Sequence, residues 1–249
     1  MSLFFDCTKP DQRAEAITAA VEASRRGDLV VLPTDTVYGL GADAFSSSGV
    51  AALLRAKGRG RDMPVPVLVG SWAALDGLVL FLPHRARELV EAFWPGGLTL
   101  VVEHAPSLLW DLGDTRGTVA VRMPLHPVAI ELLKENGPMA VSSANRTGMP
   151  PATTAQDAQQ QLGEDVYVYL DGGPSGDPVA SSIVDLTGER PRLLREGAVT
   201  ADQLRVIVND LVIDVPPKPE VQFSVPLFPD APVPDAPPPE EPSAEPPRA

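Results

Sequence analysis

Residues 28–44 read DLVVLPTDTVYGLGADA, and this stretch decides the fold class. The apolar run at 29–32 has no alternating polar residue, which is typical of a strand buried on both faces of a sheet. In open α/β sheets, ligands bind beyond the carboxyl ends of the strands. The polar side chains just after this run therefore predict a binding site there. They are Thr34, Asp35, Thr36 and Tyr38.

Helix-like and strand-like segments alternate through residues 1–214. The periodicity at 11–27 predicts an amphipathic helix that ends at Gly27. Its buried face is predicted to hold Ala14, Ile17, Val21 and Ser24. Further helices are predicted at 50–57, 84–94, 126–137 and 200–211. Further strands are predicted at 65–70, 98–103, 118–123, 138–145, 165–170, 181–186 and 191–195.

This alternation predicts an α/β fold with an open sheet, largely parallel or mixed, in which many neighbouring strands are parallel. Pro66 predicts that the strand at 65–70 lies at an edge of the sheet, because proline donates no hydrogen bond to a neighbouring strand.

Proline becomes very dense after residue 214, and the few charges there are mostly acidic. Proline removes backbone donors and disfavours helices, so residues 215–249 are predicted to be a disordered or polyproline-like tail. PxxP-like spacing in this tail also fits a docking peptide, beside the simpler interpretation as a solubilising segment. The predicted organisation is one domain at 1–214 followed by the tail.

The net charge of −13 argues against tight, direct binding of nucleic acid, because phosphate contacts supply most of that affinity. The single cysteine, Cys7, excludes an internal disulfide and a multi-cysteine metal site. The three histidines are not closely paired, so they give little support to a histidine metal site or a catalytic triad. Neither a signal peptide nor an apolar stretch of roughly 20 residues, as a membrane span needs, is found. A cytoplasmic location is therefore predicted.

Gly39, Gly41 and Ala44 match the G-x-G-x-x-A pattern of dinucleotide-binding turns. That pattern requires glycines in the strand-to-helix turn itself, whereas here Pro33 ends the apolar run well before Gly39. A Rossmann-type site is therefore disfavoured. The two glycines are instead predicted to let the backbone turn tightly and pack closely beside a pocket.

A second polar segment, AKGRGRDMP at 56–64, carries Lys57, Arg59 and Arg61 among glycines. Cations in a glycine-rich turn suit a polyphosphate, because guanidinium and backbone donors can both approach it. A solvated basic loop is the alternative interpretation.

Further polar residues follow apolar runs later in the chain. Thr118 and Arg122 are four positions apart on a predicted strand, so their side chains share one face. The other residues of this kind are Ser142, Ser143, Asn145, Ser181, Ser182, Asp185 and Arg195. Each cluster alone also fits a surface ion pair or a helix cap. Together they combine cations and hydroxyls without a histidine base or a cysteine nucleophile, which suits electrostatic and positional catalysis of nucleotidyl transfer.

Seven motifs occur in the order seen in the YrdC-like family: VLPTDTVYGLGADA, KGRGRDMPVPVLV, FWPGGLTLVV, TVAVRMP, VSSANRTGMP, SSIVDL and LLREGAV. Over about residues 12–208 the chain resembles the threonylcarbamoyl-AMP synthases of the short bacterial type. The resemblance implies a twisted α/β sheet with a large, concave, positively charged cavity. It also implies a single-domain synthase, since long members add a second domain where this chain has the proline-rich tail.

The implied reaction joins L-threonine, bicarbonate and ATP into threonylcarbamoyl-AMP and releases pyrophosphate. Mg²⁺ is expected to accompany ATP by bridging its phosphates. The resemblance further implies hand-over of the product to a tRNA threonylcarbamoyltransferase complex, which modifies the adenosine beside the anticodon, with weak or absent direct binding of tRNA.

The same resemblance implies which residues bind each substrate. The residues expected to bind L-threonine are Thr36, Tyr38, Arg122, Ser143 and Ser181. The residues expected to bind ATP are Lys57, Arg59, Thr118, Asn145 and Arg195. No residue is assigned as a general base. Asp35 is predicted to cap a turn or to hold a neighbouring cation.

The chain departs from many relatives at Gly60, where a proline is common, and at Leu68, where archaeal-type members have a histidine. The glycine predicts a looser phosphate-binding loop, and the leucine predicts the loss of one substrate contact. The alternative function is a non-catalytic RNA-binding YrdC-like module. A hydrogenase-maturation carbamoyltransferase is excluded, because it would need CxxC zinc-finger segments that a single cysteine cannot supply.

Overall fold

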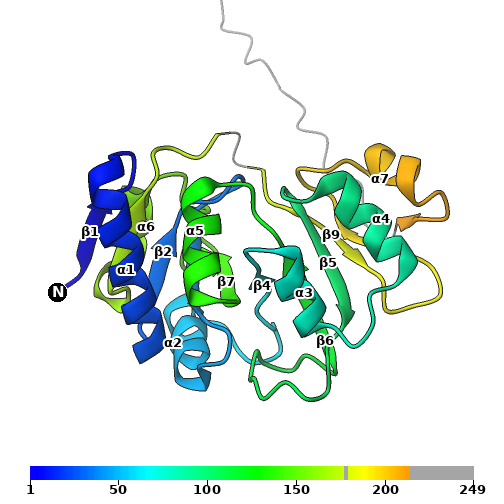
Figure 1. The fold of residues 1–249 in the computed structure, drawn as a ribbon, viewed down its shortest axis with the longest axis horizontal. Helices are drawn as coiled ribbons and strands as arrows, with labels where there is room; N and C mark the ends of the chain where they lie inside the picture. The colour runs from blue at the N-terminus through cyan, green and yellow to red at the C-terminus, as the bar shows by residue number, and fades with distance from the viewer. Residues whose placement is uncertain (177–178, 214–249) are drawn as a thin grey trace, which may run out of the picture. The chain divides into compact units, whose positions relative to one another are not determined.

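The computed structural model describes residues 1–176 and 179–213 (Figure 1). The helices of the described chain are α1 (Pro10–Arg26), α2 (Ser47–Lys57), α3 (Trp72–Leu78), α4 (His84–Phe93), α5 (Pro127–Asn136), α6 (Ala155–Leu162), the short η1 (Gly163–Asp165) and α7 (Ala201–Ile207). The predicted tail at 215–249 lies outside the described residues, so its disorder and the domain boundary before it stay predictions.

The strands of the described chain form one 11-stranded sheet. They are β1 (Leu3–Asp6), β2 (Val30–Leu32), β3 (Gly39–Asp43), β4 (Val67–Leu68), β5 (Leu98–Glu103), β6 (Thr118–Arg122), β7 (Met139–Ser143), β8 (Val168–Asp171), β9 (Ser182–Asp185), β10 (Arg192–Arg195) and β11 (Val212–Ile213). Their order is β1-β8-β2-β3-β7-β4-β6-β5-β9-β10-β11.

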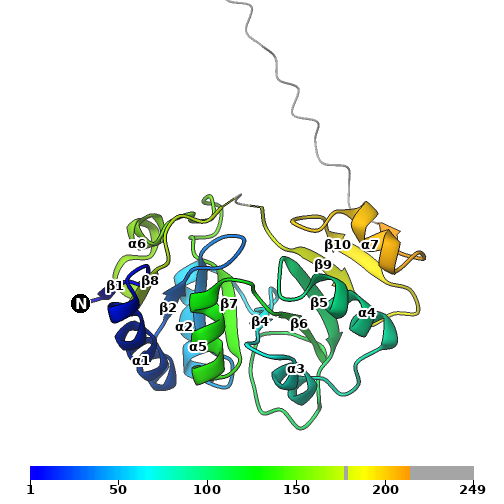
Figure 2. The same ribbon diagram turned by 45° about the horizontal axis from the view of Figure 1, so that its top comes forward.

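Parallel and antiparallel pairs alternate irregularly along this sheet. The parallel pairs are β1 with β8, β8 with β2, β4 with β6, β5 with β9, and β10 with β11. The remaining neighbours are antiparallel. The predicted α/β fold with an open, mixed sheet is therefore confirmed. Figure 2 shows β9, β10 and α7 at the end of the sheet that carries the last described part of the chain.

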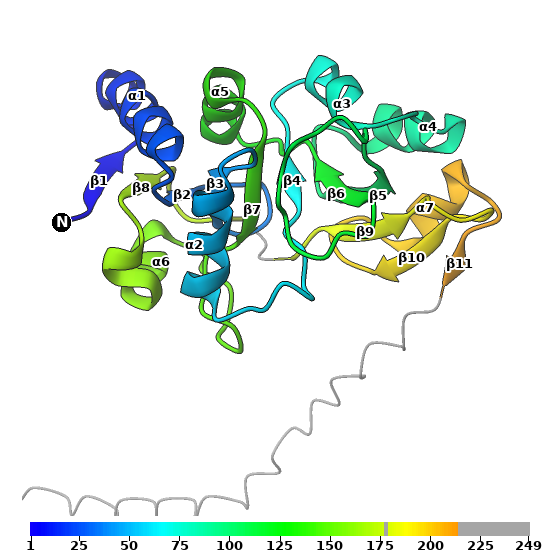
Figure 3. The same ribbon diagram turned by 90° about the horizontal axis from the view of Figure 1, so that it is seen from below.

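Helices cover both faces of the part of the sheet around β2, with α1 and α5 on one face and α2 and α6 on the other (Figure 3). The strand β2 contributes to both cores, because successive side chains of a strand point to opposite faces. Val30 and Leu32 pack in the core under α1 and α5, and Val31 packs in the opposite core. This double burial explains why residues 29–32 are uninterruptedly apolar.

The strand β4 lies inside the sheet, between β7 and β6, so the prediction of an edge strand was wrong. Only Val67 and Leu68 form the ladder, and Pro66 precedes it. Pro66 still takes part through its carbonyl, which accepts a hydrogen bond of 2.8 Å from Val141 N. A proline without a backbone N–H is therefore tolerated at the first position of an interior strand.

Gly39 and Gly41 lie in β3 as extended backbone, so the predicted tight turn at these residues was wrong. What requires glycine here is close packing between strands and side chains. A Cβ on Gly39 would lie 2.6 Å from Val141 Cγ1, and one on Gly41 would lie 3.1 Å from Met139 Cε. The strand position also removes the two residues from a strand-to-helix turn, in agreement with the disfavoured Rossmann site.

The first predicted helix is confirmed, and Gly27 ends it in the left-handed conformation at φ 88°. Ala14, however, is exposed rather than buried. The buried face consists of Ala16, Ile17, Ala20, Val21, Ala23 and Ser24. The stripe is wider than predicted because α1 packs on the sheet and beside α5 at once. In the described part of the chain, no helix is long and apolar enough to cross a membrane.

Candidate functional site

A cavity of about 230 Å³ lies where eight strands of the sheet begin or end. The carboxyl ends of β2, β4, β6, β7 and β10 reach it, as the rule for open sheets predicts. Because neighbouring strands are antiparallel, the amino ends of β3, β5 and β9 reach it as well. The mixed sheet thus brings amino and carboxyl ends of strands, with their polar side chains, to one place.

The loop between β2 and β3 forms a hydroxyl-lined wall of this cavity. Thr34 and Thr36 are 5% and 3% exposed, and their Oγ1 atoms lie 3.1 Å apart. Thr34 Oγ1 donates to Val37 O at 2.6 Å and accepts from Thr36 N at 3.2 Å. These bonds hold the loop in one conformation, so the hydroxyl of Thr36 has a fixed position.

Arg122, at the end of β6, is 6% exposed and lines the cavity beside Thr36. Its Nη1 donates to Thr36 Oγ1 at 3.0 Å, and its Nε donates to Gly96 O at 2.9 Å. Its Nη2 forms an ion pair of 2.6 Å with Asp35 Oδ1. The prediction that Asp35 holds a neighbouring cation is therefore confirmed, and the cation is Arg122.

Arg195, Ser181 and Thr99 form another part of the lining. Arg195 donates from Nε to Ser181 O at 2.9 Å and from Nη2 to Ser181 Oγ at 3.1 Å. Ser181 Oγ lies 2.9 Å from Thr99 Oγ1. Thr99 was not predicted as a site residue, because it sits inside an apolar strand where alternation alone suggests a buried core position.

Arg59 reaches the cavity from the turn after α2, and its Nη1 donates to Ser142 Oγ at 3.3 Å. Its Nε is buried and has no hydrogen-bond partner. A buried guanidinium nitrogen without an acceptor costs free energy, so a ligand that supplies an acceptor there would be stabilised.

Lys57 is 1% exposed and donates from Nζ to three oxygens: Ser143 O at 2.6 Å, Ser143 Oγ at 3.2 Å and Asn145 Oδ1 at 3.0 Å. The ammonium group of Lys57 is therefore hydrogen-bonded within the protein, and it lies behind Ser143 as seen from the cavity. The amide nitrogen of Asn145 donates to Arg146 O and Met149 O, which fixes the loop after β7.

The cavity brings together seven of the ten predicted substrate-binding residues: Thr36, Tyr38, Arg59, Arg122, Ser143, Ser181 and Arg195. Lys57 and Asn145 stand directly behind it. Thr118 does not line it, and its Oγ1 donates to Thr115 O at 2.8 Å. Thr118 and Arg122 share a strand, but four residues separate them by about 13 Å. The expected contact of Thr118 with ATP stays a prediction.

Three arginines give the cavity a positive potential although the chain as a whole is acidic. The pKa of Arg195 is lowered by burial and then by the charges of Arg122 and Arg59. Burial also lowers the pKa of Arg122, while Asp35 opposes this effect. No aspartate, glutamate, histidine or cysteine is among the described residues that line the cavity. The cavity therefore favours the binding of anions, and its described lining contains no pair of a nucleophile and a general base.

The hydroxyl of Tyr38 points out of the sheet toward the loop after β8. It donates to Gly173 O at 2.5 Å and accepts from Gly172 N at 3.0 Å. Burial raises the pKa of Tyr38, so the group stays a phenol at physiological pH. Tyr38 therefore lines the cavity with its body and anchors a loop with its hydroxyl.

The pKa of Lys57 is lowered from 10.5 to about 8 by burial and by the charge of Arg59. Between these pH values the folded protein releases this proton while the unfolded chain keeps it. We expect the free energy of unfolding of the wild type to rise from pH 8 to 10.5 relative to Lys57→Met. Urea unfolding across this range measures the difference, and a constant difference would contradict the lowered pKa.

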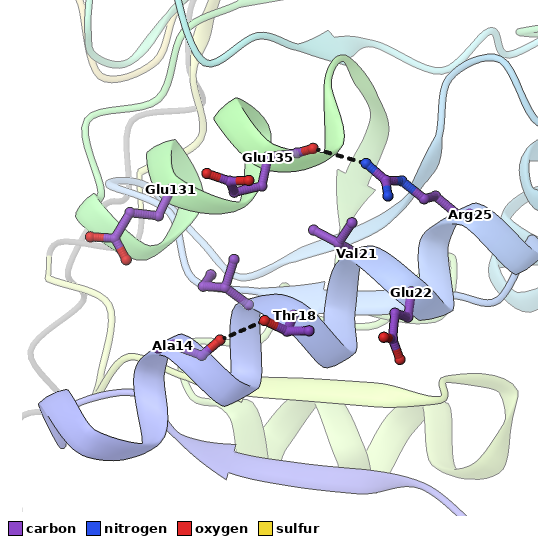
Figure 4. A pocket seen from close by; sticks show the side chains of 8 residues that line it. Ala14, Thr18, Val21, Glu22, Arg25, Glu131 and Glu135 are labelled. Carbon is purple, nitrogen blue, oxygen red and sulfur yellow. Dashed lines mark hydrogen bonds between the residues drawn. The ribbon is translucent and has the colours of Figure 1, made fainter.

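A larger hollow, of about 550 Å³, lies between α1 and α5 (Figure 4). None of the predicted site residues lines it. Its polar groups are used locally: Thr18 Oγ1 donates to Ala14 O, and Arg25 Nη2 donates to Glu135 O. Glu131 is held by Arg13 at 2.6 Å. The hollow is therefore a groove between two packed helices without the converging donors of the cavity.

Residues 1–176 and 179–213 contain no group of three or more His, Cys, Asp or Glu side chains that could bind a metal ion. The described lining of the cavity adds hydroxyls and cations only. The described lining therefore offers no carboxylate ligand for Mg²⁺.

The Sua5/YciO/YrdC family model, whose description is telomere recombination, matches residues 22–197. The chain belongs to the Sua5/YciO/YrdC family. A Mycobacterium tuberculosis protein named putative threonylcarbamoyl-AMP synthase is 62% identical over 209 residues, which cover 84% of this chain and 96% of that protein. The Bacillus subtilis threonylcarbamoyl-AMP synthase is 37% identical over 201 residues, 80% of this chain and 58% of that protein.

Solved structures of the Sua5/YciO/YrdC family share the fold. Pyrococcus abyssi Sua5 complexed with L-threonine matches with a TM-score of 0.80 and 33% identity, over 86% of this chain and 62% of that one. E. coli YciO matches with a TM-score of 0.70 and 26% identity, over 80% of this chain and 97% of that one. The resemblance seen in the seven motifs is thereby confirmed.

Proposed function

We propose that this protein is a threonylcarbamoyl-AMP synthase, which forms L-threonylcarbamoyladenylate and pyrophosphate from L-threonine, bicarbonate and ATP. The observation that carries the proposal is the convergence of Arg59, Arg122 and Arg195 on one hydroxyl-lined cavity. ATP and bicarbonate are anions and L-threonine carries a carboxylate, and such a cavity binds anionic groups. The names of the relatives that match most of this chain agree with this reaction.

L-Threonine fits the half of the cavity around Arg122. A guanidinium can bind a carboxylate through two hydrogen bonds, and Arg122 is held rigidly for that purpose. Thr36, Ser181 and Ser143 also line the cavity, so their hydroxyls are available to the ammonium and hydroxyl groups of the amino acid.

The phosphates of ATP are placed beside Arg59 and Arg195, which line the cavity. Their charges would bind the phosphates and stabilise the negative charge that develops on them in the transition state. Lys57 supports this part of the cavity from behind through Ser143 and Asn145. Contacts of Lys57, Asn145 and Thr118 with ATP itself remain part of the proposal.

The chemistry needs two steps. The threonine amine adds to the carbon of bicarbonate, or of carbon dioxide derived from it, and water is lost, which gives a carbamate. A carbamate oxygen then attacks the α-phosphorus of ATP, and pyrophosphate leaves. The residues act by binding and orienting the reactants and by stabilising charge. Mg²⁺ would bind together with ATP, through its phosphates.

We further infer a cytoplasmic location and hand-over of the product to a tRNA threonylcarbamoyltransferase complex. The support for hand-over is chemical: the product is a mixed anhydride, which reacts with water unless it is passed on. The acidic chain favours transfer to a partner enzyme over direct capture of tRNA.

Incubation with ATP, Mg²⁺, bicarbonate and labelled L-threonine tests the proposed function. Mass spectrometry should detect labelled threonylcarbamoyl-AMP, and a coupled assay should detect an equal amount of pyrophosphate. If neither product forms, the synthase proposal fails. A salt-sensitive RNA complex formed under the same conditions would then favour the non-catalytic RNA-binding module.

Replacing Arg59 by alanine is expected to lower ATP-dependent turnover by about tenfold or more, because a charge-assisted hydrogen bond to a phosphate is lost. The measurement is the KM for ATP and the rate of pyrophosphate release. Arg55→Ala removes the same charge from the exposed side of α2 and should leave both values unchanged. Equal rates for Arg59→Ala and the wild type would refute its phosphate role.

A further inference from the structure

Asp35 is the acidic partner of the cavity, yet it does not line it. Its Oδ1 accepts from Arg122 Nη2 at 2.6 Å and from Leu125 N at 2.9 Å. The carboxylate therefore stands behind the guanidinium, on the side away from a ligand. It also connects the position of Arg122 to the loop that follows β6.

The three bonds of Arg122 leave it only one orientation. A guanidinium has five N–H groups, and the bonds to Gly96, Thr36 and Asp35 use one on each of its three nitrogens. Two N–H groups therefore remain, one on each terminal nitrogen. Without the bond to Asp35, only the bonds to Gly96 O and Thr36 Oγ1 would hold the plane. The two remaining donors would then be less firmly directed.

The charge of Asp35 acts on the same group. Burial lowers the pKa of Arg122, and Asp35 works against this by stabilising the protonated form. Arg59 and Arg195 bring further positive charge close by. The carboxylate behind Arg122 therefore offsets part of the cost of burying this guanidinium.

We propose that Asp35 is a positioning residue for substrate recognition, which holds the two free N–H groups of Arg122 in the direction of the amino acid carboxylate. This inference rests on the proposed synthase function. It assigns Asp35 an effect on the binding of L-threonine and none on the binding of ATP, because the neighbouring bonds of Arg59 and Arg195 do not involve it.

The test compares four proteins with the wild type: Asp35→Asn, Arg122→Gln, the double variant, and Asp43→Asn. Asp43 is a matched control, since its Oδ1 also caps a backbone N–H, that of Phe45, at 2.9 Å but lies outside the cavity. Asparagine keeps the size and one acceptor of aspartate, so the change removes mainly the charge. Kinetics with varied L-threonine and varied ATP are measured on each.

Asp35→Asn should raise the KM for L-threonine by about tenfold, because the bond to Arg122 Nη2 loses its charge assistance, and should leave the KM for ATP within about twofold. In the Arg122→Gln background the same change should have almost no effect on kcat/KM for threonine, because the residue it positions is gone. Asp43→Asn should behave as the wild type.

Three outcomes overturn the inference. One is an unchanged KM for threonine in folded Asp35→Asn. Another is a full additional loss in the double variant, which would show that Asp35 acts independently of Arg122. If Asp35→Asn does not fold, the double variant, which buries neither charge, still tests the second outcome by comparison with Arg122→Gln. A wild type that forms no threonylcarbamoyl-AMP overturns the proposed function and this inference together.

Discussion

Arg122→Gln should lower kcat/KM for L-threonine by at least about a hundredfold. The variant loses the charge-assisted hydrogen bonds to the substrate carboxylate, each worth about 1.5–3 kcal/mol. It also leaves Asp35 largely buried without its cation, which is costly in itself. The rate of labelled threonylcarbamoyl-AMP formation at several threonine concentrations measures the effect.

Arg87→Gln is the matched control for this change, because Arg87 is an exposed arginine of α4 and does not line the cavity. It should keep wild-type kinetics. Circular dichroism shows whether Arg122→Gln is folded, so that a loss of structure is distinguished from a loss of binding. A folded Arg122→Gln with wild-type kcat/KM would refute the placement of threonine at this end of the cavity.

Gly197→Ala should lower the free energy of unfolding by about 2 kcal/mol or more, the upper range for overpacking. A Cβ on Gly197 would overlap Ala180 O and lie 2.7 Å from Ser181 C. These are backbone atoms, so no side-chain rotation can relieve the overlap. Bonds from Gly197 N to Ser182 Oγ and from Ala198 N to Ala180 O hold both segments in place.

Urea unfolding measures this loss, and kinetics should show a raised KM for threonine, because the displaced segment carries Ser181. Gly77→Ala is the matched control: a Cβ there meets nothing within 4 Å, and Gly77 lies inside α3. Alanine is favoured over glycine in a helix, so this variant should be more stable by about 0.5–1 kcal/mol. Equal stability of Gly197→Ala and the wild type would show that the two segments can separate at little cost.

Local patterns predicted most elements of the fold. The run at 29–32 predicted a strand buried on both faces, and β2 indeed contributes to two cores. The amphipathic periodicity at 11–27 likewise matches α1, and the helix predicted at 200–211 matches α7 in its first half. These signals succeed because helix and strand periodicity depends on neighbours in the chain.

The same signals failed where distant neighbours decide the conformation. Gly39 and Gly41 look like turn residues, but the side chains of Val141 and Met139 require glycine in a strand. Pro66 indicates an edge, but its carbonyl is the part that pairs with β7. The local sequence does not show which strand lies beside a residue, so the conformations at Gly39, Gly41 and Pro66 could not be predicted from it.

For the site, the sequence by itself determined the inventory: cations and hydroxyls at the ends of apolar runs, and a family that uses them. Only the tertiary structure decided how they are arranged. The antiparallel pairing of β3 with β2 and β7 and of β5 with β6 brings amino and carboxyl strand ends together. That pairing gathers Arg59, Arg122 and Arg195 in one cavity and keeps Lys57 behind it. It also places Asp35 against Arg122, since a contact across 87 residues depends on the path of the chain through the sheet.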